Sequence, residues 1–196
     1  YILTFIIPGG GIPFWKWALS PILVLFWEDN GSLIAIILLL IVLGGAFNRE
    51  LIYKMAQTIG PEAEGLGIRQ IYAPNVDIPR DPRWLRMQEC YGEDTYLVGE
   101  LGAQYVKGIQ DNNVASTVKH FISYCVPEGG INLAPVHIGE REMREVFLEP
   151  FKKCIDAGVL SVMPAYNEID GVPVHASKKL LQDLLRGELG FKGMTI

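Results

Sequence analysis

From residue 48 onward, the apolar and polar positions predict helices separated by short buried strands. The apolar residues between 51 and 59 fall on one face of a helix, which we expect to begin near Asn48 and to stop at Gly65. Three more helices and four strands follow from the same reasoning. The further helices are expected at Tyr96–Gln110, Glu140–Ala157 and Ser177–Gly187, and the strands at Gln70–Ala73, Val114–Val118, Leu160–Met163 and Gly193–Ile196.

Strands that alternate with helices imply a parallel sheet with right-handed crossovers. The surplus length of each unit lies in the loop after the strand, and in a (β/α)8 barrel those loops build the active site. A doubly wound sheet is the competing architecture, but it usually carries a Gly-rich phosphate turn after its first strand. The glycines at 9–11 have no helix pattern after them. The pattern therefore favours a barrel.

The length of the chain limits how much of a barrel it can hold. A complete (β/α)8 barrel typically takes about 250 residues, with about 200 as the lower limit. This chain has 196 residues and ends inside a predicted strand. We therefore expect an α/β fold that is a partial (β/α)8 TIM-type barrel, truncated before completion and formed by residues 48–196.

Residues 1–47 differ in character from the rest of the chain. They hold only three charged side chains, and 33–43 is an unbroken run of eleven apolar residues. A bilayer span needs about 20 apolar residues, and a signal peptide would have a basic leader and an earlier apolar run. Three interpretations stay open for this segment: a marginal membrane helix, a buried core segment, or sequence foreign to the fold.

Composition argues against several classes of function. The chain carries 17 Lys and Arg against 22 Asp and Glu, a formal charge of −5, which argues against a nucleic-acid partner. The three cysteines lie far apart without a C-x-x-C pair, and the three histidines lack the spacing of metal ligands. The sequence therefore predicts neither a disulfide framework nor a metal or other cofactor.

Charged and aromatic residues gather in the segments that follow the predicted strands. Within ten residues, the loop after the first strand has three Arg and two Asp beside a Trp, a mixture that could bind the hydroxyls and apolar face of a sugar. The alternative for Arg80, Asp81 and Arg83 is a loop held by Arg–Asp pairs. Tyr166 and Glu168 follow the third strand, where Tyr166 could contact a ligand and Glu168 could be a catalytic carboxylate or a loop cap.

Lys119 and His120 directly follow the second predicted strand. Successive residues of a regular strand point to opposite faces, so both side chains can enter one pocket only if the backbone departs from regular geometry. Such departures are costly and are found at functional sites. In the alternative arrangement, Lys119 is solvated at the edge and His120 is satisfied in the core.

Nine motifs, in this order, resemble glycoside hydrolase family 3, the β-glucosidase and β-xylosidase family. They are Phe47–Leu51, Ala73–Asp77, Asp81–Trp84, Tyr91–Asp94, Lys119–Phe121, Asn132–Val136, Glu140–Glu142, Ser161–Asn167 and Gly190–Gly193. The resemblance covers about three quarters of the chain, from 46 to 196. It implies the (β/α)8-type barrel of the family's N-terminal domain.

The resemblance also implies roles for particular residues. In the family, the last Arg of D-P-R-W-G-R and the Lys-His pair bind hydroxyls of the sugar at the cleavage site, which matches Arg86, Lys119 and His120. The Tyr of the A-Y-N motif, here Tyr166, lies close to the nucleophile. Members are retaining enzymes, in which an Asp attacks the anomeric carbon and a second carboxylic acid protonates the leaving oxygen. The resemblance implies that this Asp comes just after Ile196, so no catalytic residue is expected within the chain.

The chain departs from the family pattern at several positions. Leu85 stands where the motif has Gly, Ile131 stands where a sugar-binding Arg is common, and residues 1–47 offer no match for an early substrate-binding Asp. We therefore expect a fragment of a retaining β-glycosidase for β-linked glucosides or xylosides that is inactive alone. The alternatives are a non-catalytic carbohydrate-binding remnant, which residues 1–47 could tether to a membrane, and a different barrel enzyme that binds phosphate.

Overall fold

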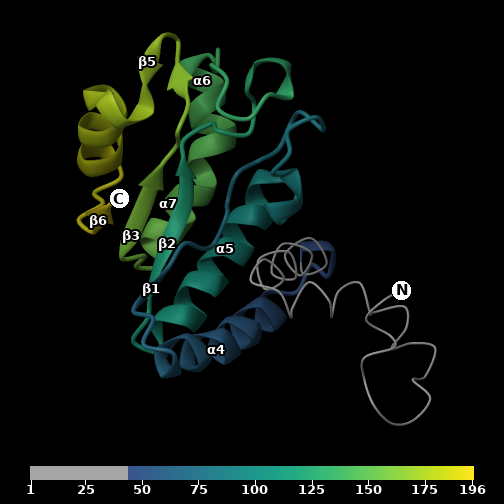
Figure 1. The fold of residues 1–196 in the computed structure, drawn as a ribbon, viewed down its shortest axis with the longest axis vertical. Coiled ribbons are helices and arrows are strands. Elements are labelled where there is room, and N and C mark those ends of the chain that lie inside the picture. The colour runs from purple at the N-terminus through teal and green to yellow at the C-terminus, as the bar shows by residue number, and fades with distance from the viewer. Residues whose placement is uncertain (1–43) are drawn as a thin grey trace, which may run out of the picture.

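The computed structural model describes residues 44–196, which are built around a four-stranded parallel sheet (Figure 1). Its strands, hydrogen-bonded in this order, are β1 (Gln70–Ile71), β2 (Ala115–Phe121), β3 (Ser161–Pro164) and β6 (Met194–Thr195). Helices fill the connections between neighbouring parallel strands, which confirms the predicted α/β class. Strand order follows chain order, as in consecutive strands of a barrel, and within the described residues the sheet does not close on itself.

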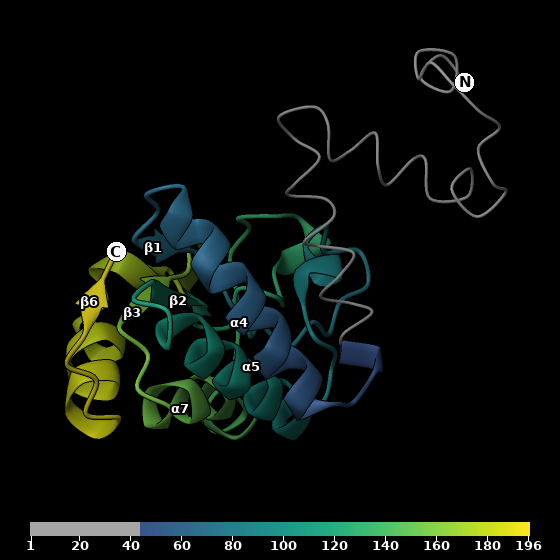
Figure 2. The same cartoon turned by 90° about the horizontal axis from the view of Figure 1, so that it is seen from below.

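Helices pack on the outer face of this sheet (Figures 1 and 2). α4 (Arg49–Gly65) lies against α5 (Thr95–Gln110), which also contacts α7 (Glu149–Asp156). The helix predicted over 140–157 begins as α6 (Glu140–Glu142) and runs through a wider π-helical stretch, η4 (Met143–Leu148), into α7. The last helix, η6 (Lys179–Glu188), has the same wider winding and precedes β6 in the chain.

Both long helices begin where a polar side chain caps their first turn. The Asn48 side chain accepts a hydrogen bond from the Leu51 amide at 3.0 Å, and the Asp94 side chain accepts one from the Leu97 amide at 2.7 Å. These bonds satisfy amides that have no partner within the helix. The start of α4 agrees with the prediction from Asn48.

A glycine allows α5 to approach the rest of the core closely. A Cβ atom at Gly102 would lie 2.6 Å from Val76 Cγ1 and 3.1 Å from Cys154 Sγ. Because real Cβ atoms do not come so close to their neighbours, any larger residue at 102 would push the helix outward. The absent side chain therefore sets the distance between α5 and the layer beneath it.

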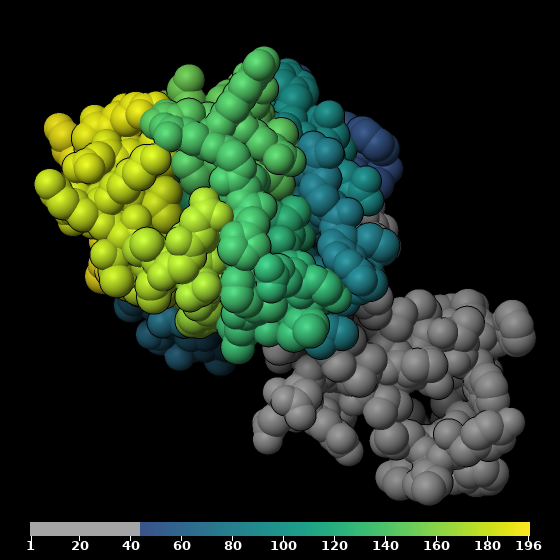
Figure 3. All heavy atoms as spheres, turned by 90° about the horizontal axis from the view of Figure 1, so that it is seen from above, coloured from purple at the N-terminus to yellow at the C-terminus, as the bar shows by residue number. Residues whose placement is uncertain are grey.

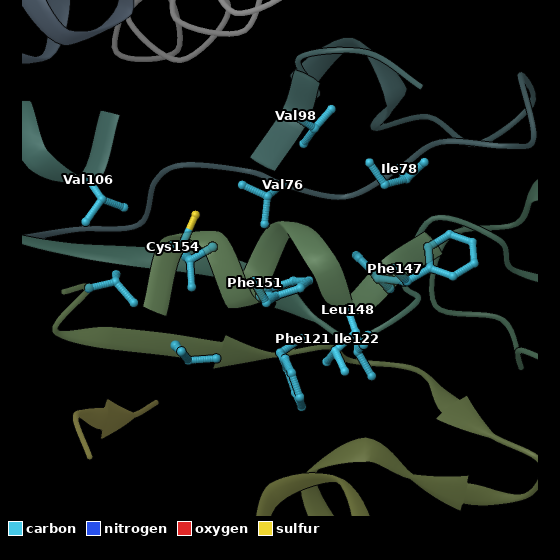
Figure 4. Packing of buried hydrophobic residues seen from close by; sticks show 14 of the residues in the cluster. Val76, Ile78, Val98, Val106, Phe121, Ile122, Phe147, Leu148, Phe151 and Cys154 are labelled. Atoms are coloured by element: carbon cyan, nitrogen blue, oxygen red, sulfur yellow. The ribbon is translucent and has the colours of Figure 1, made fainter. Parts of the chain in front are cut away.

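The hydrophobic core lies between the sheet and helices α5 and α7 (Figure 4). Phe121 from β2 and Phe151 from α7 meet edge to face, with ring centroids 5.2 Å apart. Both rings are buried, as is Val98 on the facing side of α5. This apolar contact fixes the end of β2, from which the polar residues of the site project.

The fold departs from the sequence prediction mainly in three places, and in the first β1 ends at Ile71, two residues before the predicted end at Ala73. β2 continues to Phe121, three residues beyond the predicted end at 118. A short antiparallel hairpin of β4 (Glu168–Ile169) and β5 (Val172–Pro173) follows β3 and was not predicted. Its turn is Asp170-Gly171, a dipeptide that commonly joins such strands. The remaining short helices, all in loops, are η2 (Met87–Glu89), η3 (Glu128–Gly130) and η5 (Val174–Ala176).

The predictions for residues 1–43, including the membrane helix, lie outside the described residues. Between residues 44 and 196, no helix combines the length and the apolar character needed to cross a membrane. The division into an apolar segment at 1–47 and a barrel part at 48–196 therefore stays a prediction.

Candidate functional site

Polar side chains gather at the carboxyl end of β1 and β2. The segment after β1 runs beside β2, where the Val76 amide donates to the Lys119 carbonyl at 2.9 Å. Figure 3 looks onto this end of the sheet, where the segments that follow β1, β2 and β3 lie side by side in blue-teal, green and yellow-green. The topology thus brings three separate stretches of the chain to one face.

Lys119 and His120 both join one cluster of charged side chains. The pairing of β2 with β3 shifts register between Lys119 and Phe121. Lys119 Nζ lies 3.9 Å from Glu89 Oε2, and His120 Nδ1 lies 2.8 Å from Asp77 Oδ2. The backbone therefore departs from regular strand geometry at the position where the sequence required it for both residues to share a site.

Arg86 and Glu89 form a two-pronged ion pair in this cluster. Arg86 Nε donates to Glu89 Oε1 at 2.7 Å, and Nη2 donates to Oε2 at 2.8 Å. Burial by itself lowers the pKa of Arg86 and raises the pKa of Glu89. The paired hydrogen bonds and opposite charges outweigh burial, so the pKa of Arg86 is raised and that of Glu89 is lowered. Both groups are therefore charged at neutral pH.

For Lys119 and His120 of β2, in contrast to Arg86 and Glu89, the effect of burial on the pKa outweighs that of the neighbouring charges. Burial lowers the pKa of Lys119, and the charge of Glu89 opposes that shift only in part. It also lowers the pKa of His120 below its ordinary value of 6.5, against the attraction of Asp77. His120 is thus neutral at pH 7, and its Nδ1 donates to the Asp77 carboxylate, because an ionised carboxylate can only accept.

Aromatic rings form a wall beside the charged cluster. The Tyr124 ring lies 4.8 Å from the His120 ring and 6.0 Å from the Tyr166 ring, measured between centroids. Tyr166 in turn stacks on His175, which comes from the loop after the hairpin, at 6.3 Å. Tyr166 is 57% exposed, so its ring offers an apolar face to solvent next to buried donors.

All four residues predicted for the site, Arg86, Lys119, His120 and Tyr166, meet on this face. Tyr166 is tied to the cluster through His120, with ring centroids 6.2 Å apart. Asp81 and Glu168, two further candidates from the sequence, have partners outside the cluster. Asp81 pairs with Arg83 at 2.7 Å as a local ion pair, and Glu168 belongs to the β4–β5 hairpin, where its backbone carbonyl accepts from the Val136 amide.

Four residues of the site were not singled out from the sequence. Asp77 and Asn132 lay within motifs, and Asn132 Oδ1 accepts hydrogen bonds from Tyr124 at 2.8 Å and Trp84 at 3.3 Å. Glu89 had only its position three residues after Arg86 as a local signal. No sequence pattern pointed to Tyr124, because its partners come from other loops.

The donors of the cluster suit an uncharged polyol better than a metal. The Arg86 guanidinium and the Lys119 ammonium donate hydrogen bonds, which sugar hydroxyls can accept. Within residues 44–196, no three His, Cys, Asp or Glu side chains are grouped so that they could hold a metal ion. The arrangement joins fixed hydrogen-bond donors to an exposed aromatic face, as sugar sites do.

Comparison with known proteins gives a consistent match. The family model of the glycosyl hydrolase family 3 N-terminal domain matches residues 39–196. A β-xylosidase of Formosa agariphila is 43% identical over 157 residues, which cover 75% of this chain and 22% of that protein. A periplasmic β-glucosidase of Salmonella typhimurium is 37% identical over 160 residues, covering 79% of this chain and 21% of that protein.

A solved structure agrees with these sequence relatives. The crystal structure of a β-glucosidase from Listeria innocua in complex with glucose superposes with a TM-score of 0.78 at 36% identity. The match covers 80% of this chain and 23% of that one. The chain thus spans about a fifth of the length of the relatives it matches.

Proposed function

Because the chain belongs to glycosyl hydrolase family 3, we propose that residues 44–196 form the sugar-binding side of the barrel domain of a β-glucosidase or β-xylosidase. The observation that carries this proposal is the convergence of Arg86, Lys119 and His120 beside the exposed ring of Tyr166. Relatives named for β-glucosides and β-xylosides support the substrate class. The ligand we propose is therefore a neutral sugar in β linkage.

Each side chain of the cluster has a hydrogen-bonding group left for a ligand. Arg86 uses Nε and Nη2 for Glu89 and also hydrogen-bonds the Tyr124 side chain, which leaves part of its five N–H donors for a ligand. Lys119 has three donors on a flexible stem. His120 is held at Nδ1 by Asp77, so that Nε2 can accept a hydrogen bond from a hydroxyl. Tyr166 would cover the C–H face of the ring.

We further propose that the 196 residues by themselves bind such a sugar without cleaving it. Retaining cleavage needs two carboxyl groups about 5–5.5 Å apart, one as nucleophile and one as acid. The buried carboxylates of the cluster are already engaged, Asp77 by His120 and Glu89 by Arg86. Both oxygens of each carboxylate already accept hydrogen bonds, so we do not assign either group as the nucleophile.

Binding and cleavage are tested separately on the purified chain. We expect saturation-transfer NMR to detect methyl β-D-glucopyranoside on the wild type and not on Arg86→Met or Lys119→Met. Arg141→Met is the matched control, because Arg141 lies in an exposed pair with Glu145. Equal signals from all four proteins would contradict the proposed site.

The cleavage assay uses an aryl β-D-glucoside, and the absorbance of the released phenol follows the reaction. We expect no release above that of a blank reaction. Turnover that disappears in Lys119→Met would contradict the proposal that these residues bind without cleaving. Membrane tethering through residues 1–47 and the lack of a nucleic-acid partner stay predictions from the sequence.

A further inference from the structure

Glu89 lies between the two cations of the site. Its carboxylate receives both hydrogen bonds from Arg86, at 2.7 and 2.8 Å, and its Oε2 lies 3.9 Å from Lys119 Nζ. Asn75 Nδ2, from a fully buried side chain, is 3.5 Å from the same oxygen. The Glu89 side chain is only 15% exposed, so little water screens these contacts.

Charge in the cluster is balanced by this arrangement. Arg86 and Lys119 each carry one positive charge, and Glu89 and Asp77 each carry one negative charge. His120 is neutral at pH 7 because burial lowers its pKa. Two unpaired cations in such a poorly hydrated place would be costly, and an anion would relieve that cost. Glu89 fills the position that an anionic ligand would otherwise take.

We propose that Glu89 is a positioning residue that restricts this site to uncharged sugars by neutralising Arg86 and Lys119. The proposal rests on the proposed sugar-binding function and specifies its substrate class. A uronate carboxylate or a phosphate would have to compete with Glu89 for the Arg86 guanidinium, within a few ångströms of a like charge. A neutral hydroxyl meets no such repulsion and still finds the donors that Glu89 leaves free.

The test compares neutral and anionic ligands on the 196-residue chain. The ligands are methyl β-D-glucopyranoside, methyl β-D-glucuronide and inorganic phosphate, and NMR titration at neutral pH and low salt gives each affinity. For the wild type we expect binding of the glucoside alone. In Glu89→Gln the shape is retained and the charge is lost, so we expect affinity for glucuronide or phosphate to rise about tenfold or more.

Glu93→Gln is the matched control, because Glu93 is exposed in the same loop and its loss changes the net charge equally. We expect it to leave all three affinities unchanged. A purely structural role for Glu89 predicts only weaker glucoside binding and no gain for anions. Circular dichroism verifies that Glu89→Gln is folded.

Two results would overturn the proposal. In the first, the wild type binds glucuronide or phosphate as tightly as the glucoside, a result that is decisive even if no variant folds. In the second, a folded Glu89→Gln gains no affinity for either anion. Absence of glucoside binding to the wild type would instead contradict the proposed function itself, so the two failures are distinguishable.

Discussion

The buried pair of Asp77 and His120 supports a quantitative prediction about stability. Both side chains are 1% exposed, and Asp77 Oδ2 lies 2.8 Å from His120 Nδ1. Asp77 Oδ1 also accepts from the His120 amide at a longer 3.4 Å. Replacing Asp77 by Ala removes the acceptor for both groups and leaves the imidazole N–H buried without a partner.

The expected loss in the free energy of unfolding follows from those contacts. A hydrogen bond to a charged group is worth about 1.5–3 kcal/mol, and a buried donor left without a partner costs about 1–3 kcal/mol. These ranges describe overlapping parts of one loss, and the long amide contact adds little, so we expect Asp77→Ala to lower the free energy of unfolding by about 3 kcal/mol. Asp77→Asn keeps a neutral acceptor and should lose about half as much.

Equilibrium urea unfolding followed by circular dichroism measures this difference. Glu145→Ala is the matched control, because Glu145 Oε1 accepts from Arg141 at the same 2.8 Å while both side chains are largely exposed. Such a surface pair is worth less than about 1 kcal/mol. Equal losses of stability in Asp77→Ala and Glu145→Ala would contradict this prediction, because burial would then add nothing to a contact of the same length.

Two further predictions concern the packing of α5 and the histidines. Gly102→Ala should destabilise the fold by about 1–2 kcal/mol, because the overpacking cost exceeds the gain in helix propensity. Gly65 lies at the open end of α4, where nothing comes within 4 Å of an added Cβ, so Gly65→Ala should leave the free energy of unfolding unchanged or raise it by up to about 1 kcal/mol. A stability change of the same sign in both glycine variants, measured by urea unfolding, would contradict this. In NMR titrations, His120 should titrate below 6.5 because it is buried, and His137 above 6.5 because Asp170 bonds its ring. His120 therefore binds a proton more readily in the unfolded chain than in the folded one, so its contribution to stability should be lost as the pH falls below 6.5. His120→Gln should make stability less dependent on pH in this range. A His120 that titrates at or above 6.5 would contradict the neutral imidazole of the site.

Sequence periodicity predicted the elements whose apolar faces are buried. The helix at 96–110 and the strand at 160–163 were recognised because their apolar residues recur with the period of one element. The β4–β5 hairpin was missed, since each of its strands has two residues and offers no period to detect. Only the Asp170-Gly171 turn marked it, and a single dipeptide is a weak signal.

The site was predictable where residue types and motifs were distinctive. Arg86, Lys119, His120 and Tyr166 were identified through the resemblance, and the structure brings them to one face. Glu89 was not, because its importance lies in a contact with Lys119, 30 positions further along the chain. Contacts of that kind depend on how the loop after β1 folds against the end of β2, which local patterns do not encode.

The proposed sugar site is the face formed by the ends of β1, β2 and β3. A protein-observed NMR titration of the isotope-labelled chain with methyl β-D-glucopyranoside tests it most directly. We predict that the shifted resonances concentrate at Lys119, His120 and Tyr166. The contradicting result would be shifts concentrated at the hollow lined by Arg144 and Lys179 on the helical side, or shifts nowhere at all.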